Sequence, residues 1–73
     1  MNKLCELTVV WVNPNDDCKV AAVAAQETIG NVIVNGFGFV QLAKPVKVGK
    51  TITLPKGYSF RLQRENQWTV MPE

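Results

Sequence analysis

The side chains that most often carry out catalysis are scarce in this chain. It contains no histidine, the usual general base near neutral pH. Ser59 is the only serine and falls within a predicted strand, and Cys5 and Cys18 have no histidine to activate their thiols. Asp16 and Asp17 are adjacent, but they lie in a segment typical of turns. Because no nucleophile can be paired with a base, the sequence predicts a protein that is not an enzyme and has no catalytic site.

The two cysteines give little support to metal or disulfide chemistry. Cys5 and Cys18 show no Cys-x-x-Cys spacing, whereas structural zinc sites use four cysteine or histidine ligands. A tight hairpin between them would hold their Cα atoms farther apart than the roughly 7 Å that a disulfide allows. The sequence therefore predicts no metal and no cofactor, and it leaves the redox state of both thiols open.

Basic and aromatic side chains come together in the second half of the sequence. Residues 41–73 carry a net charge of +4, whereas residues 1–40 carry −2. Proteins that bind single-stranded nucleic acid combine a cationic groove with aromatic rings that stack on the bases. One interpretation is therefore a nucleic-acid surface, and the other is a solvated face that keeps the protein soluble. The candidate nucleic-acid-binding residues are Phe37, Phe39, Lys56, Tyr58, Arg61 and Arg64.

Two segments resemble the RNA-binding part of cold-shock domains. Residues 35–40 read NGFGFV, which is similar to the first RNA-binding motif of that family, and residues 8–13 read TVVWVN, similar to the strand before it. The resemblance implies a small barrel that binds single strands. In cold-shock domains the two segments are nearly contiguous, whereas more than twenty residues separate them here, and Asn35 replaces a basic residue. The alternative is that Phe37 and Phe39, which share one strand face, are buried in the core; their large apolar area favours this placement.

A second resemblance covers residues 20–54. An alanine-rich stretch ends in Glu27-Thr28, a valine-rich segment lies between Gly30 and Gly36, and PVKVGK follows at 45–50. This rhythm is similar to the small β-barrel modules of tailed-phage virion proteins, especially capsid decoration and head-stabilising proteins. The resemblance implies a structural protein that assembles with protein partners, as a homo-oligomer or in a capsid lattice.

Short alternating segments predict an all-β fold. Residues 4–12 form a strand in which one face is buried, and residues 13–17 form a tight turn. A hairpin with Trp11 opposite Cys18 predicts that residues 20–26 form the next strand with its even-numbered side chains in the same core. The side chains predicted on that buried face are Cys5, Leu7, Val9, Trp11, Cys18, Val20, Ala22 and Ala24.

The remaining segments complete the predicted sheet. Residues 31–34 and 37–42 are two strands, or one strand broken at Gly36. Further strands are expected at 51–54, at 58–63 with Tyr58, Phe60 and Leu62 on one face, and at 67–71. Residues 55–57 and 65–66 are turns. The prediction is one domain, residues 1–73, folded as a small β-barrel, OB-like or SH3-like, of about five short antiparallel strands.

The size of the chain favours assembly. A domain of 73 residues buries only about 60% of the surface that its unfolded chain exposes, and 47% of these residues are hydrophobic. A partner subunit would bury apolar surface that the monomer leaves exposed to water. The leading hypothesis is a non-enzymatic structural protein that acts by assembly, such as a phage capsid decoration or cement protein. The alternatives are a single-strand nucleic-acid-binding barrel and a phage-encoded inhibitor of a host protein.

The same sequence predicts no membrane partner and no secretion. No run of 18 apolar residues is present, as a membrane-spanning helix requires. Glu6 interrupts any apolar core that a signal peptide would need. The predicted location is a virion or the cytoplasm of a host cell.

Overall fold

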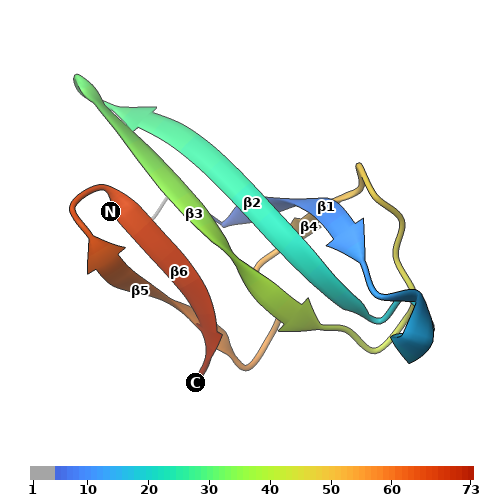
Figure 1. Ribbon diagram of the computed structural model, residues 1–73. Coiled ribbons are helices and arrows are strands. Elements are labelled where there is room, and N and C mark those ends of the chain that lie inside the picture. Colours follow the sequence, from blue (N-terminus) through green and yellow to red (C-terminus); the bar gives the residue numbers. More distant parts are fainter. Residues whose placement is uncertain (1–4) are drawn as a thin grey trace.

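The computed structural model describes residues 5–73 and places six strands in one mixed sheet (Figure 1). The strands are β1 (Glu6–Val12), β2 (Val20–Ile29), β3 (Val32–Gln41), β4 (Thr51–Thr53), β5 (Tyr58–Arg64) and β6 (Gln67–Pro72), and their order in the sheet is β4-β1-β2-β3-β6-β5. One 3-10 turn, η1 (Pro14–Asp16), joins β1 to β2. The predicted all-β class is confirmed.

The strand count and directions differ from the expectation of about five antiparallel strands. The sheet has six, and β3 pairs with β6 in parallel. A parallel pair requires a long connection. Here the chain leaves β3, adds β4 to the far edge beside β1, and returns through β5 before it reaches β6.

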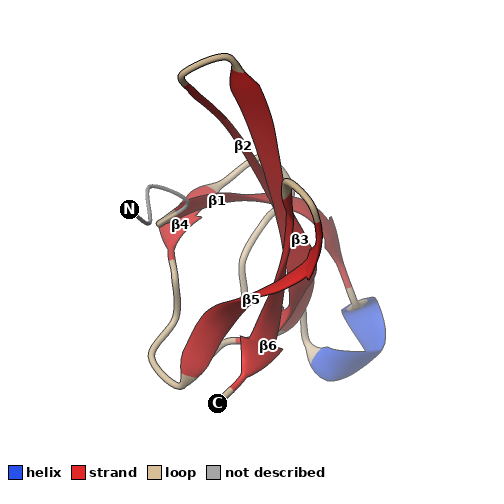
Figure 2. Cartoon of the chain, turned by 90° about the vertical axis from the view of Figure 1, so that its left-hand side faces the viewer, coloured by secondary structure: helices blue, strands red, loops and turns tan. Residues whose placement is uncertain are grey.

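The core lies on the inner side of a strongly bent sheet. Figure 2 shows the end that holds β1 and β4 curling toward the same side as the end that holds β5 and β6. Apolar side chains from β1, β2, β3 and β6 fill this side, and the rings of Tyr58 and Phe60, which were predicted to share a face, pack against them. The buried cluster consists of Leu7, Val9, Ala21, Val23, Val40 and Val70.

The predicted pairing of the first two strands is wrong. Val9 pairs with Val23, and after a register shift Trp11 pairs with Ala22, not with Cys18. The cause is the connection, which is longer than a tight turn. Asn13 caps η1 by accepting a hydrogen bond from the Asn15 backbone at 3.0 Å, and two residues with positive φ follow.

This change of register reverses the predicted faces of β2. The buried positions are Ala21 and Val23, whereas Ala22 belongs to the opposite side of the sheet with Trp11. Cys5 is exposed, Cys18 is half-buried, and no disulfide joins Cys18 to another residue. Of the predicted β1 face, only Leu7 and Val9 lie in the core.

The strands β2 and β3 form one long hairpin. They pair continuously from Val20–Gln41 to Ile29–Val32, so Gly36 does not break the second strand. Gly30 takes a φ of +64° in the two-residue turn, a conformation that favours glycine. Figures 1 and 2 show that the hairpin tip projects beyond the other strands.

The two later turns lie where the sequence predicts them. Gly57 has a φ of +92°, as a turn glycine there should have. The Tyr58 N–H donates to the Pro55 carbonyl at 3.2 Å, so proline holds the first position of this turn and not the second, which its residue type had suggested. Asn66 has a φ of +65° between β5 and β6. No helix within residues 5–73 is long and apolar enough to cross a membrane.

Candidate functional site

Three large aromatic rings lie exposed on the outer side of the sheet, opposite the core. The exposed fractions are 45% for Trp11, 44% for Phe37 and 63% for Phe39. The prediction that Trp11 lies in the core is wrong. For Phe37 and Phe39 the sequence left two placements open, and the one it favoured, burial in the core, is wrong. We call the surface formed by Trp11, Phe37 and Phe39 the aromatic face.

A β-bulge places Trp11 on the aromatic face. The register shift between Val9 and Trp11 inserts Val10 as an extra residue in β1, so that both Val10 and Trp11 are exposed. Bulges re-aim side chains in this way and are frequent near functional sites. Trp11 pairs with Ala22, which pairs with Phe39, and the small alanine lets the two rings meet edge to face with centroids 6.2 Å apart.

Glycine determines the outward position of Phe37 and Phe39. Gly38 lies between them on the inner side and pairs with Val70 of β6. A Cβ atom on Gly38 would collide with the Val70 carbonyl and lie 2.9 Å from its Cβ. The inner side of β3 is therefore closed at this point, and its bulky side chains occupy the outer side.

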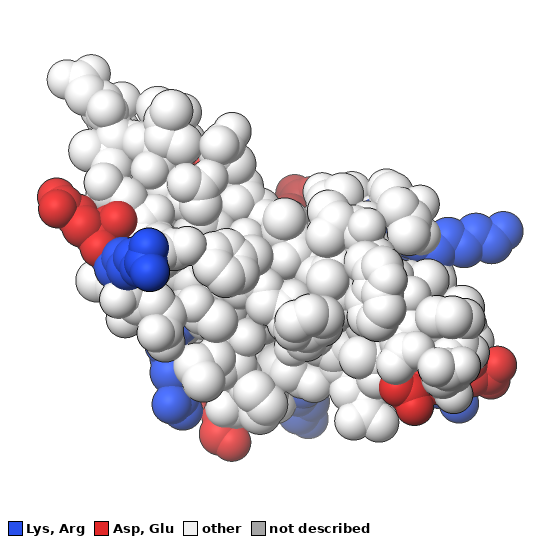
Figure 3. Space-filling model, in the orientation of Figure 1, with Lys and Arg blue, Asp and Glu red and all other residues white. Residues whose placement is uncertain are grey.

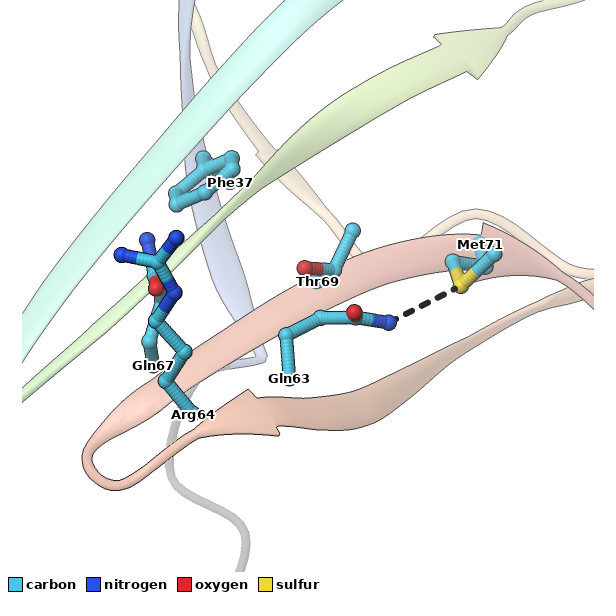
Figure 4. Close-up of a pocket in the computed structure, with 6 residues that line it drawn as sticks. All are labelled: Phe37, Gln63, Arg64, Gln67, Thr69 and Met71. Atoms are coloured by element: carbon cyan, nitrogen blue, oxygen red, sulfur yellow. Dashed lines mark hydrogen bonds between the residues drawn. The ribbon is translucent and has the colours of Figure 1, made fainter.

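A shallow, open cavity of about 450 Å³ lies beside Phe37 on the outer side of β6, between side chains of β3 and β5 (Figure 4). Figure 4 shows the side chains of Arg64 and Gln67 extending toward the ring of Phe37. Phe37 pairs with Thr69, and Thr69 with Arg61, so the three side chains share the outer side of the sheet. We call this cavity the Phe37 pocket; it is lined by Phe37, Gln63, Arg64, Gln67, Thr69 and Met71.

Charged side chains lie at the margins of the outer side and not at its centre. Figure 3, in which β2, β3 and β6 face the viewer as in Figure 1, shows an uncharged middle with Lys, Arg, Asp and Glu side chains around it. Arg61 and Arg64 are exposed on β5, at one edge of the sheet. The arrangement is an uncharged, aromatic centre with side chains of both charges at its margins, among them Arg61 and Arg64.

The structure brings together four of the six predicted nucleic-acid-binding residues. Phe37, Phe39, Arg61 and Arg64 lie on the outer side. The ring of Tyr58 packs against the core, and its hydroxyl accepts a hydrogen bond from the Gln41 backbone N–H at 2.6 Å. Lys56 lies in the turn between β4 and β5.

Several residues of this surface were missed in the sequence. Trp11 was assigned to the core because strict alternation hides a bulge. The sequence did not mark three polar residues of the Phe37 pocket as functional, namely Gln63, Gln67 and Thr69. Isolated polar residues on strands usually only face solvent. The alternation of glycine and phenylalanine at 36–39 could have indicated outward rings, since glycine occupies the opposite side of the same strand.

The candidate site combines aromatic, amide and cationic groups on one side of the sheet. No three His, Cys, Asp or Glu side chains gather as a metal site in the part of the chain that the structure describes. Comparisons with protein-family models, with curated proteins and with solved structures find no match for this chain.

Proposed function

We propose that the protein binds single-stranded nucleic acid through the aromatic face. The observation that carries the proposal is the cluster of three exposed rings on one side of the sheet, with Trp11 and Phe39 in direct contact. Rings presented in this way are platforms for nucleobases, and each stacked base contributes about 1–3 kcal/mol. A contiguous exposed apolar patch on a small protein generally marks an interaction site.

The two arginines beside the rings supply the contact to phosphate. Arg61 shares the outer side with Phe37 through Thr69, and Arg64 lines the Phe37 pocket. Guanidinium groups bind phosphate oxygens with two parallel hydrogen bonds. A strand whose bases stack on Phe37 and Phe39 would therefore run its backbone along the β5 edge.

The topology supports the same proposal. The edge strands β4 and β5 are consecutive in the chain, with only residues 54–57 between them, and β3 runs parallel to β6. If β4 and β5 are two halves of one broken strand, this order is that of the five-stranded OB barrel, which binds oligonucleotides on one sheet face. We propose that the bent sheet is an OB-like barrel.

Fluorescence anisotropy with a labelled single-stranded oligonucleotide at about 50 mM salt, where phosphate contacts are strong, tests the proposal. We expect wild-type protein to bind and Phe39→Ala to bind at least fivefold more weakly, since it removes one stacking platform. Leu62→Ala is the matched control, because Leu62 is exposed but pairs with Trp68 on the inner side. No binding by the wild type, or equal losses in the two variants, would contradict the proposal.

A second candidate function is assembly with protein partners, as a homo-oligomer or a virion component such as a capsid decoration protein. The observation that favours it is the projecting tip of the β2–β3 hairpin, which exposes Val32 by 40% and Ile33 by 55%. A largely apolar cavity of about 330 Å³ lies next to it. It is lined by Ile29, Val32, Val34, Leu62, Glu65, Asn66 and Trp68. This tip is distinct from the aromatic face, so the two proposals can be tested separately.

A further inference from the structure

We propose that the Phe37 pocket holds one nucleotide unit and distinguishes its base through side-chain amides. This inference rests on the proposed function and adds base selectivity to it. The ring of Phe37 supplies the stacking surface, Arg64 and Gln67 extend toward that ring, and Gln63 lies farther along the pocket with its amide on the Met71 sulfur. In the proposed complex the two amides contact the edge of the base and Arg64 contacts a phosphate. A volume of about 450 Å³ lies within the range of small-molecule sites, about 300–1,000 Å³.

A second bulge concentrates polar side chains in this pocket. The register of β5 and β6 shifts between Leu62, which pairs with Trp68, and Arg64, which pairs with Gln67. The extra residue is Gln63, so Gln63 and Arg64 both line the outer cavity although they are neighbours in the chain. Strict alternation would send one of them to the other side of the sheet. The bulge thus brings an amide and a guanidinium to the same place.

The polar groups of the pocket have hydrogen-bonding capacity to spare. The Gln63 amide nitrogen donates to the Met71 sulfur at 3.8 Å, and a thioether is a weak acceptor. A carbonyl oxygen or ring nitrogen of a base is a better acceptor, so exchanging the sulfur for a base is favourable. Within residues 5–73, no group hydrogen-bonds or ion-pairs with the side chains of Gln67 or Arg64.

The composition of the pocket fits a nucleotide better than an uncharged apolar ligand. Amides both donate and accept, which suits the mixed edges of nucleobases, and unstacked bases of single strands are recognised at these edges. None of the six lining residues is acidic, so a phosphate meets one cation and no like charge. A free nucleotide and a unit within a strand present the same chemistry, and the experiment below separates them.

Competition anisotropy with four homopolymeric single strands tests the inference. We expect the wild type to favour one base over the least favoured by about tenfold or more, the size that one well-placed amide–base contact gives. In the double variant Gln63→Ala/Gln67→Ala the preference should fall to about twofold, because the favoured base loses its contacts with the two amides. The matched control is Gln41→Ala, an exposed amide of β3 outside the pocket, which should keep the preference.

The outcomes separate this inference from the proposed function. If the wild type binds all four strands within twofold, or if Gln41→Ala loses the preference as well, the inference is overturned and the proposed function stands. If no strand binds, both fail. Thr69→Val, which removes a pocket hydroxyl without changing shape, is a second variant should the double variant not fold, and it should also reduce the preference.

Competition with mononucleotides shows whether the pocket binds a free nucleotide or only a nucleotide within a strand. If the preferred nucleoside monophosphate displaces the oligonucleotide with the same ranking of bases, the pocket also accepts free nucleotides, which supports a pocket that reads the base alone. A ranking of the four mononucleotides that contradicts the ranking of the strands would overturn the inference.

Discussion

The indole ring of Trp11 and the phenyl ring of Phe39 meet edge to face, with their centroids 6.2 Å apart and their planes at 86°, although β2 lies between their strands. Ala22 occupies the intervening position and is too small to separate them. A bulky residue there would cover one or both rings. The small side chains on the outer side of β2 thus leave room for the rings that β1 and β3 carry on either side of it. This explains why alanine suits the outer positions of β2.

The first prediction concerns Trp11. Because this side chain is exposed, Trp11→Ala should lower the free energy of unfolding by only about 0.5–1.5 kcal/mol, the value of an aromatic pair. Its affinity for a single strand should fall by about 1–3 kcal/mol, the value of one stacked base. Leu7→Ala is the contrast, since Leu7 is fully buried and its truncation should cost about 2–5 kcal/mol of stability. Urea unfolding and anisotropy measure the two quantities; a loss of stability at Trp11 as large as at Leu7 would contradict its position.

A second prediction concerns Gly38. Gly38→Ala should destabilise the protein by about 1–3 kcal/mol or more, because the added Cβ collides with Val70 and must push β6 away from β3. The urea midpoint should fall, and Ser59→Ala, which adds no atom to a strand, should change stability by no more than about 0.5 kcal/mol. Equal midpoints for the two variants would show that β3 and β6 do not approach as described.

Tyr58 allows a third prediction that separates packing from binding. Tyr58→Phe removes the acceptor of the Gln41 N–H and should cost about 0.5–1.5 kcal/mol of stability. Nucleic-acid affinity should not change, because the ring packs against the core. A large loss of affinity with unchanged stability would return Tyr58 to the binding surface on which the sequence placed it.

The salt dependence of binding gives a fourth prediction. Each phosphate neutralised on a single strand contributes about −0.7 to the slope of log K against log salt. Arg64→Gln should therefore make the slope less negative by about that amount, and Arg61→Gln should do the same. Lys56→Gln is the control, because Lys56 lies in a turn and does not line the Phe37 pocket. If all three variants gave the same slope, the proposal that Arg61 and Arg64 contact the phosphates would be contradicted.

A fifth prediction tests assembly independently of nucleic acid. If the hairpin tip joins two copies, wild-type protein should sediment as an oligomer, and Ile33→Lys should sediment as a monomer because it charges the exposed tip. Thr53→Lys places the same charge on an exposed position of β4, at the far edge of the sheet from the β2–β3 hairpin tip, and should leave the oligomer intact. A monomeric wild type at high micromolar concentration would contradict self-association.

The fold class was predictable from the sequence because turn residues delimit its strands clearly. The positions of the turns at 55–57 and 65–66 and the shared face of Tyr58 and Phe60 follow from local rules, and the structure confirms them. That this face is the inner one, so that Tyr58 packs against the core, was not predicted. The parallel pairing of β3 with β6 was not predictable, since no local pattern records which distant strands become neighbours.

The candidate site was predictable only in part, and the two bulges explain why. Alternation places Leu7 and Val9 in the core correctly, and after the first bulge it fails for Trp11. Continued past Leu62 it would send Arg64 to the inner side, whereas the second bulge keeps Arg64 on the outer side. The aromatic face and the Phe37 pocket both depend on these shifts. A bulge inserts one residue that no particular type of side chain marks. A prediction that assumes strict alternation of side chains along a strand therefore cannot detect it.

The most direct test of the central claim is a titration of isotope-labelled protein with a single-stranded oligonucleotide, followed through backbone amide shifts. The claim is that the aromatic face is the binding surface. We expect the largest shift changes at Trp11, Phe37, Phe39 and their cross-strand neighbours Ala22 and Thr69, with the hairpin tip at Val32 and Ile33 unchanged. No shift changes, or changes confined to the hairpin tip, would contradict it.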